Sequence, residues 1–156
     1  MEIWKKYKQY IIVAGLVLAA GGLSALLAGG FSNYNMMEKP PFSPPSWVFP
    51  VVWSVVYIMM GIAAVMVSRS NDIDKSSALR LFVLQLIVNL IWPIIFYRFE
   101  APKFALFWLL LLIILVILTT RSFFSVSKKA GWLMIPYIIW LFVAFYLNFG
   151  IVALNS

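Results

Sequence analysis

Long apolar stretches alternate with short charged segments along the whole chain. None of the 12 basic and five acidic residues falls inside five stretches, which run over residues 9–37, 40–68, 81–97, 104–120 and 130–156. A helix rises about 1.5 Å per residue, so each stretch nearly or fully crosses a hydrocarbon layer about 30 Å thick. In lipid, backbone N–H and C=O groups must bond internally, and such stretches therefore become helices. The pattern predicts an all-α membrane protein, a single bundle of five transmembrane helices.

We place the five helices at residues 10–30, 47–67, 78–97, 103–121 and 132–153. The first connection is long and rich in Asn, Pro and aromatic residues, whereas the others are short, so sequential helices should be antiparallel neighbours. These spans use most of the 156 residues, and we expect residues 1–156 to form one domain. The first apolar run exceeds the length of a signal-peptide core, which favours an uncleaved span.

The distribution of basic residues predicts the orientation in the membrane. The N-terminus and the second and fourth connections carry nine: Lys5, Lys6, Lys8, Arg69, Lys75, Arg80, Arg121, Lys128 and Lys129. The opposite side carries three: Lys39, Arg98 and Lys103. This bias predicts a multi-pass protein of the cell membrane, surrounded by the lipid bilayer, with its N-terminus cytoplasmic and its C-terminus outside. Basic residues confined to short loops fit topology rather than phosphate tracking, so we expect no nucleic-acid partner despite the net charge of +7.

Several kinds of chemistry are excluded by composition. The chain has no Cys and no His, which removes disulfides, a thiol nucleophile and the commonest metal and haem ligand. The apolar stretches hold no charged residue, which argues against a proton pump with an intramembrane carboxylate. We therefore expect no metal and no intrinsic cofactor.

Aromatic, amide and small side chains recur four residues apart on three of the predicted helices. The rows are Trp53, Tyr57 and Gly61; Gln85 and Asn89, followed by Trp92; and Pro136, Trp140, Ala144 and Asn148. Residues four apart lie on the same side of a helix. Such rows either line a pocket for a flat ligand, with Gly61 and Ala144 making room, or simply pack helices together. Spacing alone leaves both interpretations open.

Other small and aromatic residues have simpler interpretations. Four tryptophans near predicted helix ends suit membrane-interface anchors: Trp4, Trp47, Trp108 and Trp132. Gly21, Ala25 and Gly29 form a ridge of small residues on the first helix, which favours a packing seam within the bundle over a dimer contact. Four prolines at positions 40–45 stiffen the entry to the second helix, which suits either a lid over the bundle or a rigid linker.

Three of these segments resemble the tryptophan-rich sensory protein family, also called translocator proteins or peripheral-type benzodiazepine receptors. The matching pieces are KPPFSPPSWVFPVVWSVVY, QLIVNLIWPIIF and IPYIIWLFVAFYLNFGIVALN, in this order on the second, third and fifth predicted helices. They cover roughly a third of the chain, and the five-span layout covers all of it.

The resemblance implies a five-helix bundle, commonly a homodimer, with a pocket that opens toward the first loop. Members of the family bind porphyrins and other flat hydrophobic molecules, including benzodiazepine-type drugs and, in animals, cholesterol. The positions that match the family's pocket are Trp53, Asn89 and Trp140, surrounded by Tyr57, Trp92, Ala144 and Leu147, with Tyr34 and Pro44 as contributors to a lid. The cholesterol motif of animal members is absent, because no Lys or Arg follows Tyr146, and a bacterial-type role is favoured.

Three functions are compatible with the resemblance. The first is a receptor or sensor that binds protoporphyrin-type tetrapyrroles, with porphyrin as ligand. The second is light-dependent oxidative degradation of protoporphyrin as substrate, with Trp53 and Trp140 as the catalytic residues; the excited porphyrin would have to drive it, since no acid–base constellation exists. The third is a tetrapyrrole transporter, although the chain shows neither an inverted repeat nor a coupling-ion site.

Overall fold

Five long helices account for almost the whole chain. The computed structural model describes residues 2–30 and 32–155, without the side chains of residues 32 and 33; positions 1, 31 and 156, which the predicted domain and first connection include, lie outside it. The long helices are α1 (Glu2–Leu27), α2 (Val48–Ser68), α3 (Lys75–Pro93), α4 (Pro102–Val126) and α5 (Lys128–Leu154). A short 3-10 helix, η1 (Ser32–Met36), precedes α2, and a π-helical segment, η2 (Ile94–Arg98), extends α3. Five spans are long and apolar enough to cross a membrane, which confirms the predicted fold class.

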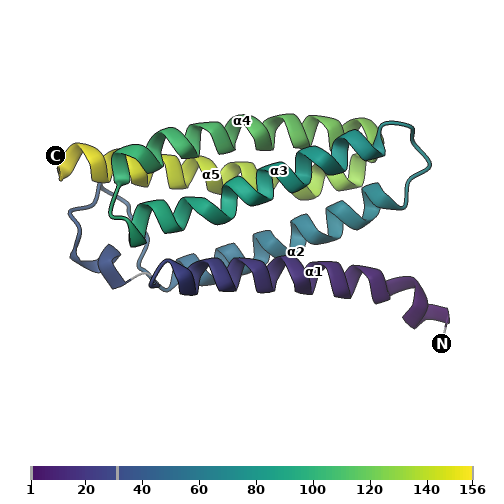
Figure 1. Cartoon of the computed structure of the whole chain (residues 1–156), viewed down its shortest axis with the longest axis horizontal. Coiled ribbons are helices and arrows are strands. Elements are labelled where there is room, and N and C mark those ends of the chain that lie inside the picture. Colours follow the sequence, from purple (N-terminus) through teal and green to yellow (C-terminus); the bar gives the residue numbers. More distant parts are fainter. Residues whose placement is uncertain (1, 31, 156) are drawn as a thin grey trace.

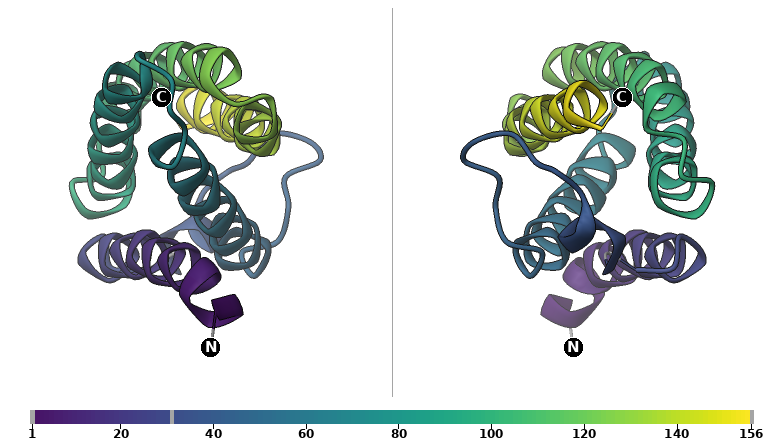
Figure 2. Two further views of the ribbon diagram at one scale, coloured as in Figure 1. Left: turned by 90° about the vertical axis from the view of Figure 1, so that its right-hand side faces the viewer. Right: turned by 90° about the vertical axis from the view of Figure 1, so that its left-hand side faces the viewer.

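The helices run up and down along one axis, and the connections gather at its two ends. The N-terminus and the α2–α3 connection lie at one end, and the C-terminus and the η1 connection lie at the other (Figure 1). Seen end-on, α3, α4 and α5 form an arc, α2 lies across its open side, and α1 packs outside α2 (Figure 2). We call the end with η1 and the C-terminus the lid end.

Several helices extend beyond the apolar stretches that predicted them. Helix α1 begins at Glu2 rather than at residue 10, α4 continues to Val126, and α5 already begins at Lys128. The turn between α4 and α5 is Ser127 alone, whose side chain caps α5 by accepting from the backbone N–H of Ala130. Charged residues mark the edge of the hydrocarbon layer, but helical hydrogen bonds hold equally well in the polar region beyond it.

Small residues bring α1 and α2 into close contact. A Cβ atom at Gly61 would lie 2.7 Å from Cα of Ala14, and one at Gly21 would lie 2.2 Å from a ring carbon of Tyr57. No side chain fits at either position without moving a neighbour. Gly21 therefore belongs to a seam within the bundle, as the sequence predicts. Gly61, in contrast, serves this helix contact and does not make room for a ligand.

Three of the four predicted anchor tryptophans are exposed, as an anchor at the membrane interface has to be. Trp4, Trp47 and Trp132 are exposed on the bundle, 58%, 66% and 65% respectively. The prediction is wrong for Trp108, because its indole N–H donates to the carbonyl of Val88 at 2.8 Å and so ties α4 to α3.

Candidate functional site

A small cavity at the lid end is walled almost entirely by aromatic and aliphatic side chains. It lies where α2, the end of α3 with η2, and α5 meet beneath the first connection, and its volume is about 20 Å³. We call it the aromatic pocket, and its lining residues are Tyr34, Phe49, Trp53, Trp92, Phe96, Tyr97, Trp140, Ala144, Leu147, Asn148 and Ile151.

Aromatic rings form a continuous wall from the lid down into the bundle. Phe49 meets Tyr34 edge-on at 4.7 Å between centroids and lies 5.8 Å from Trp140. The Trp53 ring stands edge-on to Trp140 at 6.2 Å and stacks on Tyr57 at 5.5 Å. Offset and edge-on arrangements of this kind are the favourable ones for aromatic pairs. The wall therefore presents both ring faces and ring edges to whatever occupies the pocket.

The two buried indoles of the pocket differ in their hydrogen bonding. The Trp92 N–H donates to the side-chain oxygen of Asn148 at 3.1 Å, and the Asn148 amide donates in turn to the carbonyl of Pro102 at 2.9 Å. The N–H of Trp140 is buried and meets no hydrogen-bond partner among the described residues. A buried donor without an acceptor is costly and calls for an explanation. A ligand with an acceptor atom in the pocket would provide one.

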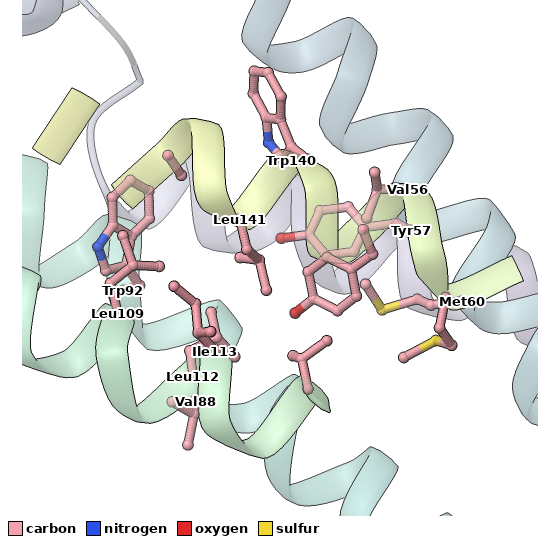
Figure 3. Packing of buried hydrophobic residues seen from close by; sticks show 14 of the residues in the cluster. Val56, Tyr57, Met60, Val88, Trp92, Leu109, Leu112, Ile113, Trp140 and Leu141 are labelled. Atoms are coloured by element: carbon pink, nitrogen blue, oxygen red, sulfur yellow. The ribbon is translucent and has the colours of Figure 1, made fainter. Parts of the chain in front are cut away.

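A chain of hydrogen bonds fills the core below the pocket. The Tyr57 hydroxyl donates to the side-chain oxygen of Asn89 at 2.7 Å, and the Asn89 amide donates to the hydroxyl of Tyr137 at 2.7 Å. Tyr137 donates to the oxygen of Gln85 at 2.7 Å. The same core holds Tyr57 and Met60 toward one end of the hydrophobic cluster and Trp92 toward the other, with Leu141 between (Figure 3). Both ends of the Asn89 amide are thus engaged within the protein.

The first connection covers the pocket and is tied down at several points. The Tyr34 hydroxyl donates to the carbonyl of Pro44 at 2.7 Å, and burial raises the pKa of this hydroxyl, which keeps its proton in place. From α5, the Tyr146 hydroxyl donates to the carbonyl of Pro41 at 2.7 Å. Beyond the end of α5, the Asn155 amide donates to the Glu38 carbonyl at 2.9 Å. We call residues 37–46 the lid.

The structure separates the predicted site residues into three groups. Those that line the aromatic pocket are Tyr34, Trp53, Trp92, Trp140, Ala144 and Leu147. Asn89 and Tyr57 lie in the hydrogen-bonded core instead, although Tyr57 also lines a second cavity described below. Pro44 belongs to the lid and contributes its carbonyl rather than its ring.

Four pocket-lining residues were not singled out from the sequence: Phe49, Phe96, Tyr97 and Ile151. Three of them could have been found by extending the spacing of four. Phe49 precedes Trp53 by four residues on α2, and Ile151 follows Leu147 by four on α5. Phe96 follows Trp92 by four, and the two rings stack at 5.3 Å between centroids, although Phe96 already lies in the π-helical segment η2. Tyr97 lies in the same segment and follows none of the singled-out residues by four.

Comparison with known proteins agrees with the architecture. A sequence model described as the TspO/MBR family matches residues 12–154. The chain is 36% identical over 157 residues to the tryptophan-rich protein TspO of Chlorobaculum tepidum, which covers 95% of this chain and 98% of that protein. It is 36% identical to protein CrtK of Rhodobacter capsulatus (87% of this chain, 86% of that protein) and 33% identical to the human translocator protein (77% and 73%). With its five spans and tryptophan-lined pocket, the chain belongs to the TspO/MBR family.

Proposed function

We propose that this protein is an integral membrane receptor that binds protoporphyrin-type tetrapyrroles and other flat hydrophobic molecules, including benzodiazepine-type ligands, in the aromatic pocket. The observation that carries the proposal is the buried N–H of Trp140, which has no hydrogen-bond partner among the described residues, in a wall of aromatic rings. Flat rings would stack on the indoles, and an acceptor atom on the ligand would satisfy the N–H. The names of relatives, sensory protein and translocator protein, are compatible with a receptor of this kind.

The pocket must expand to hold such a ligand. Ligand sites for small molecules usually enclose about 300–1,000 Å³, far more than the cavity of about 20 Å³ here. The ring contacts that fill the space are weak individually, at about 0.5–1.5 kcal/mol per pair beyond area burial. Stacking on an aromatic ring is worth roughly 1–3 kcal/mol per planar base in nucleic-acid systems, so a planar ligand would replace these contacts with comparable ones.

A second candidate is light-dependent oxidative degradation of protoporphyrin. The edge-on pair of Trp53 and Trp140, 6.2 Å apart, favours it, since two oxidisable rings would flank the same ligand. The bound porphyrin would absorb the light and be the substrate, dissolved dioxygen would be the oxidant, and the chain would supply no cofactor of its own.

The two candidates predict different outcomes in one experiment. Purified protein in lipid nanodiscs is titrated with protoporphyrin in the dark, and its tryptophan emission is followed. We expect saturable quenching, which a benzodiazepine-type ligand reverses by competition. Under illumination, a stable porphyrin spectrum would leave a receptor, whereas loss of porphyrin beyond the free-porphyrin control would support the degrading enzyme. Quenching that never saturates would contradict both.

We further propose the orientation with the N-terminus cytoplasmic, in which the lid faces outward. The structure groups the basic segments that carry the positive-inside bias, because the N-terminus and the α2–α3 connection lie at the same end of the bundle (Figure 1). A reporter enzyme that is active only in the cytoplasm, fused to the C-terminus, is expected to stay inactive. Strong activity would reverse the assignment. The homodimer stays a proposal that rests on the family resemblance.

A further inference from the structure

A second cavity opens on the side of the bundle, between α1, α2 and the end of α3. Its volume is about 230 Å³, roughly ten times that of the aromatic pocket. We call it the lateral cleft, and its lining residues are Leu18, Gly21, Gly22, Ala25, Pro50, Trp53, Ser54, Tyr57, Trp92 and Pro93. Helix α1, which contributes four of them, lies on the outside of the bundle (Figure 2).

Three of the four residues that α1 contributes to the cleft, Gly21, Gly22 and Ala25, are small, which leaves the cleft open. Gly22 has open space beside it, since a Cβ atom there would meet nothing within 4 Å. Ser54 also lines the cleft, but its hydroxyl already donates to the carbonyl of Pro50 in the same helix. Leu23 and Leu26, which follow the lining residues Gly22 and Ala25 in the chain, are 57% and 77% exposed on α1, as residues that face lipid are. The cleft therefore presents an apolar opening to the hydrocarbon of the bilayer.

The lateral cleft and the aromatic pocket share two walls, Trp53 and Trp92. The Trp92 indole is held by its hydrogen bond to Asn148, whereas the described contacts of the Trp53 ring are with other rings, those of Tyr57, Tyr137 and Trp140. Moving Trp53 therefore breaks no described hydrogen bond. A change of its side-chain rotamer would connect the two cavities.

The lid offers a less favourable way in. Opening the lid would break three hydrogen bonds to lid carbonyls. Tyr34 donates to Pro44, Tyr146 donates to Pro41, and Asn155 donates to Glu38. Opening would also separate the close packing of Pro40 on Gly150, where an added Cβ would lie 2.4 Å from the proline ring. Several coupled contacts must be lost at once, whereas the cleft needs one side chain to turn.

We propose that flat ligands reach the aromatic pocket sideways from the bilayer, through the lateral cleft, with the Trp53 side chain as the gate. The proposal rests on the proposed function. The mouth lies near the lid end, because Pro50 is in the first turn of α2 and Pro93 is the last residue of α3. A ligand with an apolar ring and polar groups at one edge, such as a porphyrin with its carboxylates, would keep those groups at the membrane surface while its ring passes inward.

Filling the cleft tests the route. We expect Gly22→Phe, which places a ring where a Cβ has free space, to slow protoporphyrin association and release by about tenfold. The equilibrium constant should change little, since the final site lies behind Trp53. Ser54→Phe, on the opposite wall of the cleft, should slow both rates in the same way. It provides the test if Gly22→Phe folds poorly. Phenylalanine adds no indole, so stopped-flow quenching of tryptophan emission in nanodiscs remains readable.

Gly15→Phe is the matched control. Gly15 lies about two turns earlier on the same side of α1, also has nothing within 4 Å of an added Cβ, and lies outside the cleft. It should leave both rates unchanged. Tyr146→Phe, which loosens the lid, should leave them unchanged as well.

The outcomes separate the route from the function. The lateral route would be overturned in favour of the lid if Gly22→Phe and Ser54→Phe bind and release protoporphyrin at wild-type rates while Tyr146→Phe does so faster. The binding function itself would then still stand. Slow rates in Gly15→Phe equal to those in Gly22→Phe would also overturn it. Absence of saturable binding to the wild-type protein would overturn the proposed function, and the route with it.

Discussion

Replacing Asn89 with leucine is expected to lower the free energy of unfolding by about 1–2 kcal/mol, a large effect for one polar side chain in a membrane protein. The substitution leaves the buried Tyr57 hydroxyl without its acceptor and removes the amide that donates to the Tyr137 hydroxyl. A buried hydroxyl that loses its acceptor costs free energy. Because both ends of the Asn89 amide are engaged within the protein, affinity for protoporphyrin should change much less than stability.

A double variant provides the control. Tyr57→Phe together with Asn89→Leu removes both partners of the bond, so most of the lost stability should return. Unfolding is followed by heat or by a denaturing detergent in mixed micelles, alongside the protoporphyrin titration. If Asn89→Leu keeps its stability and loses affinity instead, then Asn89 contacts the ligand directly, which is the role that the family resemblance implies.

The bundle could be predicted from the sequence because the membrane imposes it. A stretch without charge that is long enough to cross the hydrocarbon layer has no alternative to a helix, and five such stretches gave five helices. The helix ends could not be predicted in this way. Lys5 and Lys128 lie within α1 and α5, since a helix keeps its own hydrogen bonds on leaving the lipid.

The candidate site could be predicted only in part, because its geometry depends on which helices become neighbours. Spacing placed Gln85 and Asn89 on one side of α3, but their partner Tyr137 comes from α5. In the same way, spacing marked Gly61 as small without showing that its neighbour would be Ala14 of α1. The lateral cleft was beyond prediction, as a cavity consists of the volume that several helices together leave unfilled.

Trp140→Phe is expected to weaken protoporphyrin binding by about tenfold, or roughly 1.4 kcal/mol, and to lower the stability of the free protein less than the same change at Trp92 does. Phenylalanine keeps much of the stacking area and removes a buried N–H that has no described acceptor, so the free protein loses part of the indole packing but no described hydrogen bond. The comparison variant is Trp92→Phe. It removes an N–H that is bonded to Asn148, and it should therefore lower stability by about 1 kcal/mol. A smaller loss of stability in Trp140→Phe than in Trp92→Phe, together with weaker binding in Trp140→Phe, would show that the Trp140 donor serves the ligand.

The same substitution, combined with Trp53→Phe, decides whether the pocket is chemically active. If the indoles take part in photochemistry, the double variant should lose nearly all light-driven loss of porphyrin at saturating ligand, because phenylalanine is far harder to oxidise than tryptophan. Binding should weaken only in proportion to the lost N–H and stacking area. Protoporphyrin fluorescence titration in the dark and single-turnover decay under illumination are measured on the same preparations. Full turnover in the double variant would exclude Trp53 and Trp140 as catalytic residues, and a Trp140→Phe variant with unchanged affinity would mean that no ligand atom accepts its hydrogen bond.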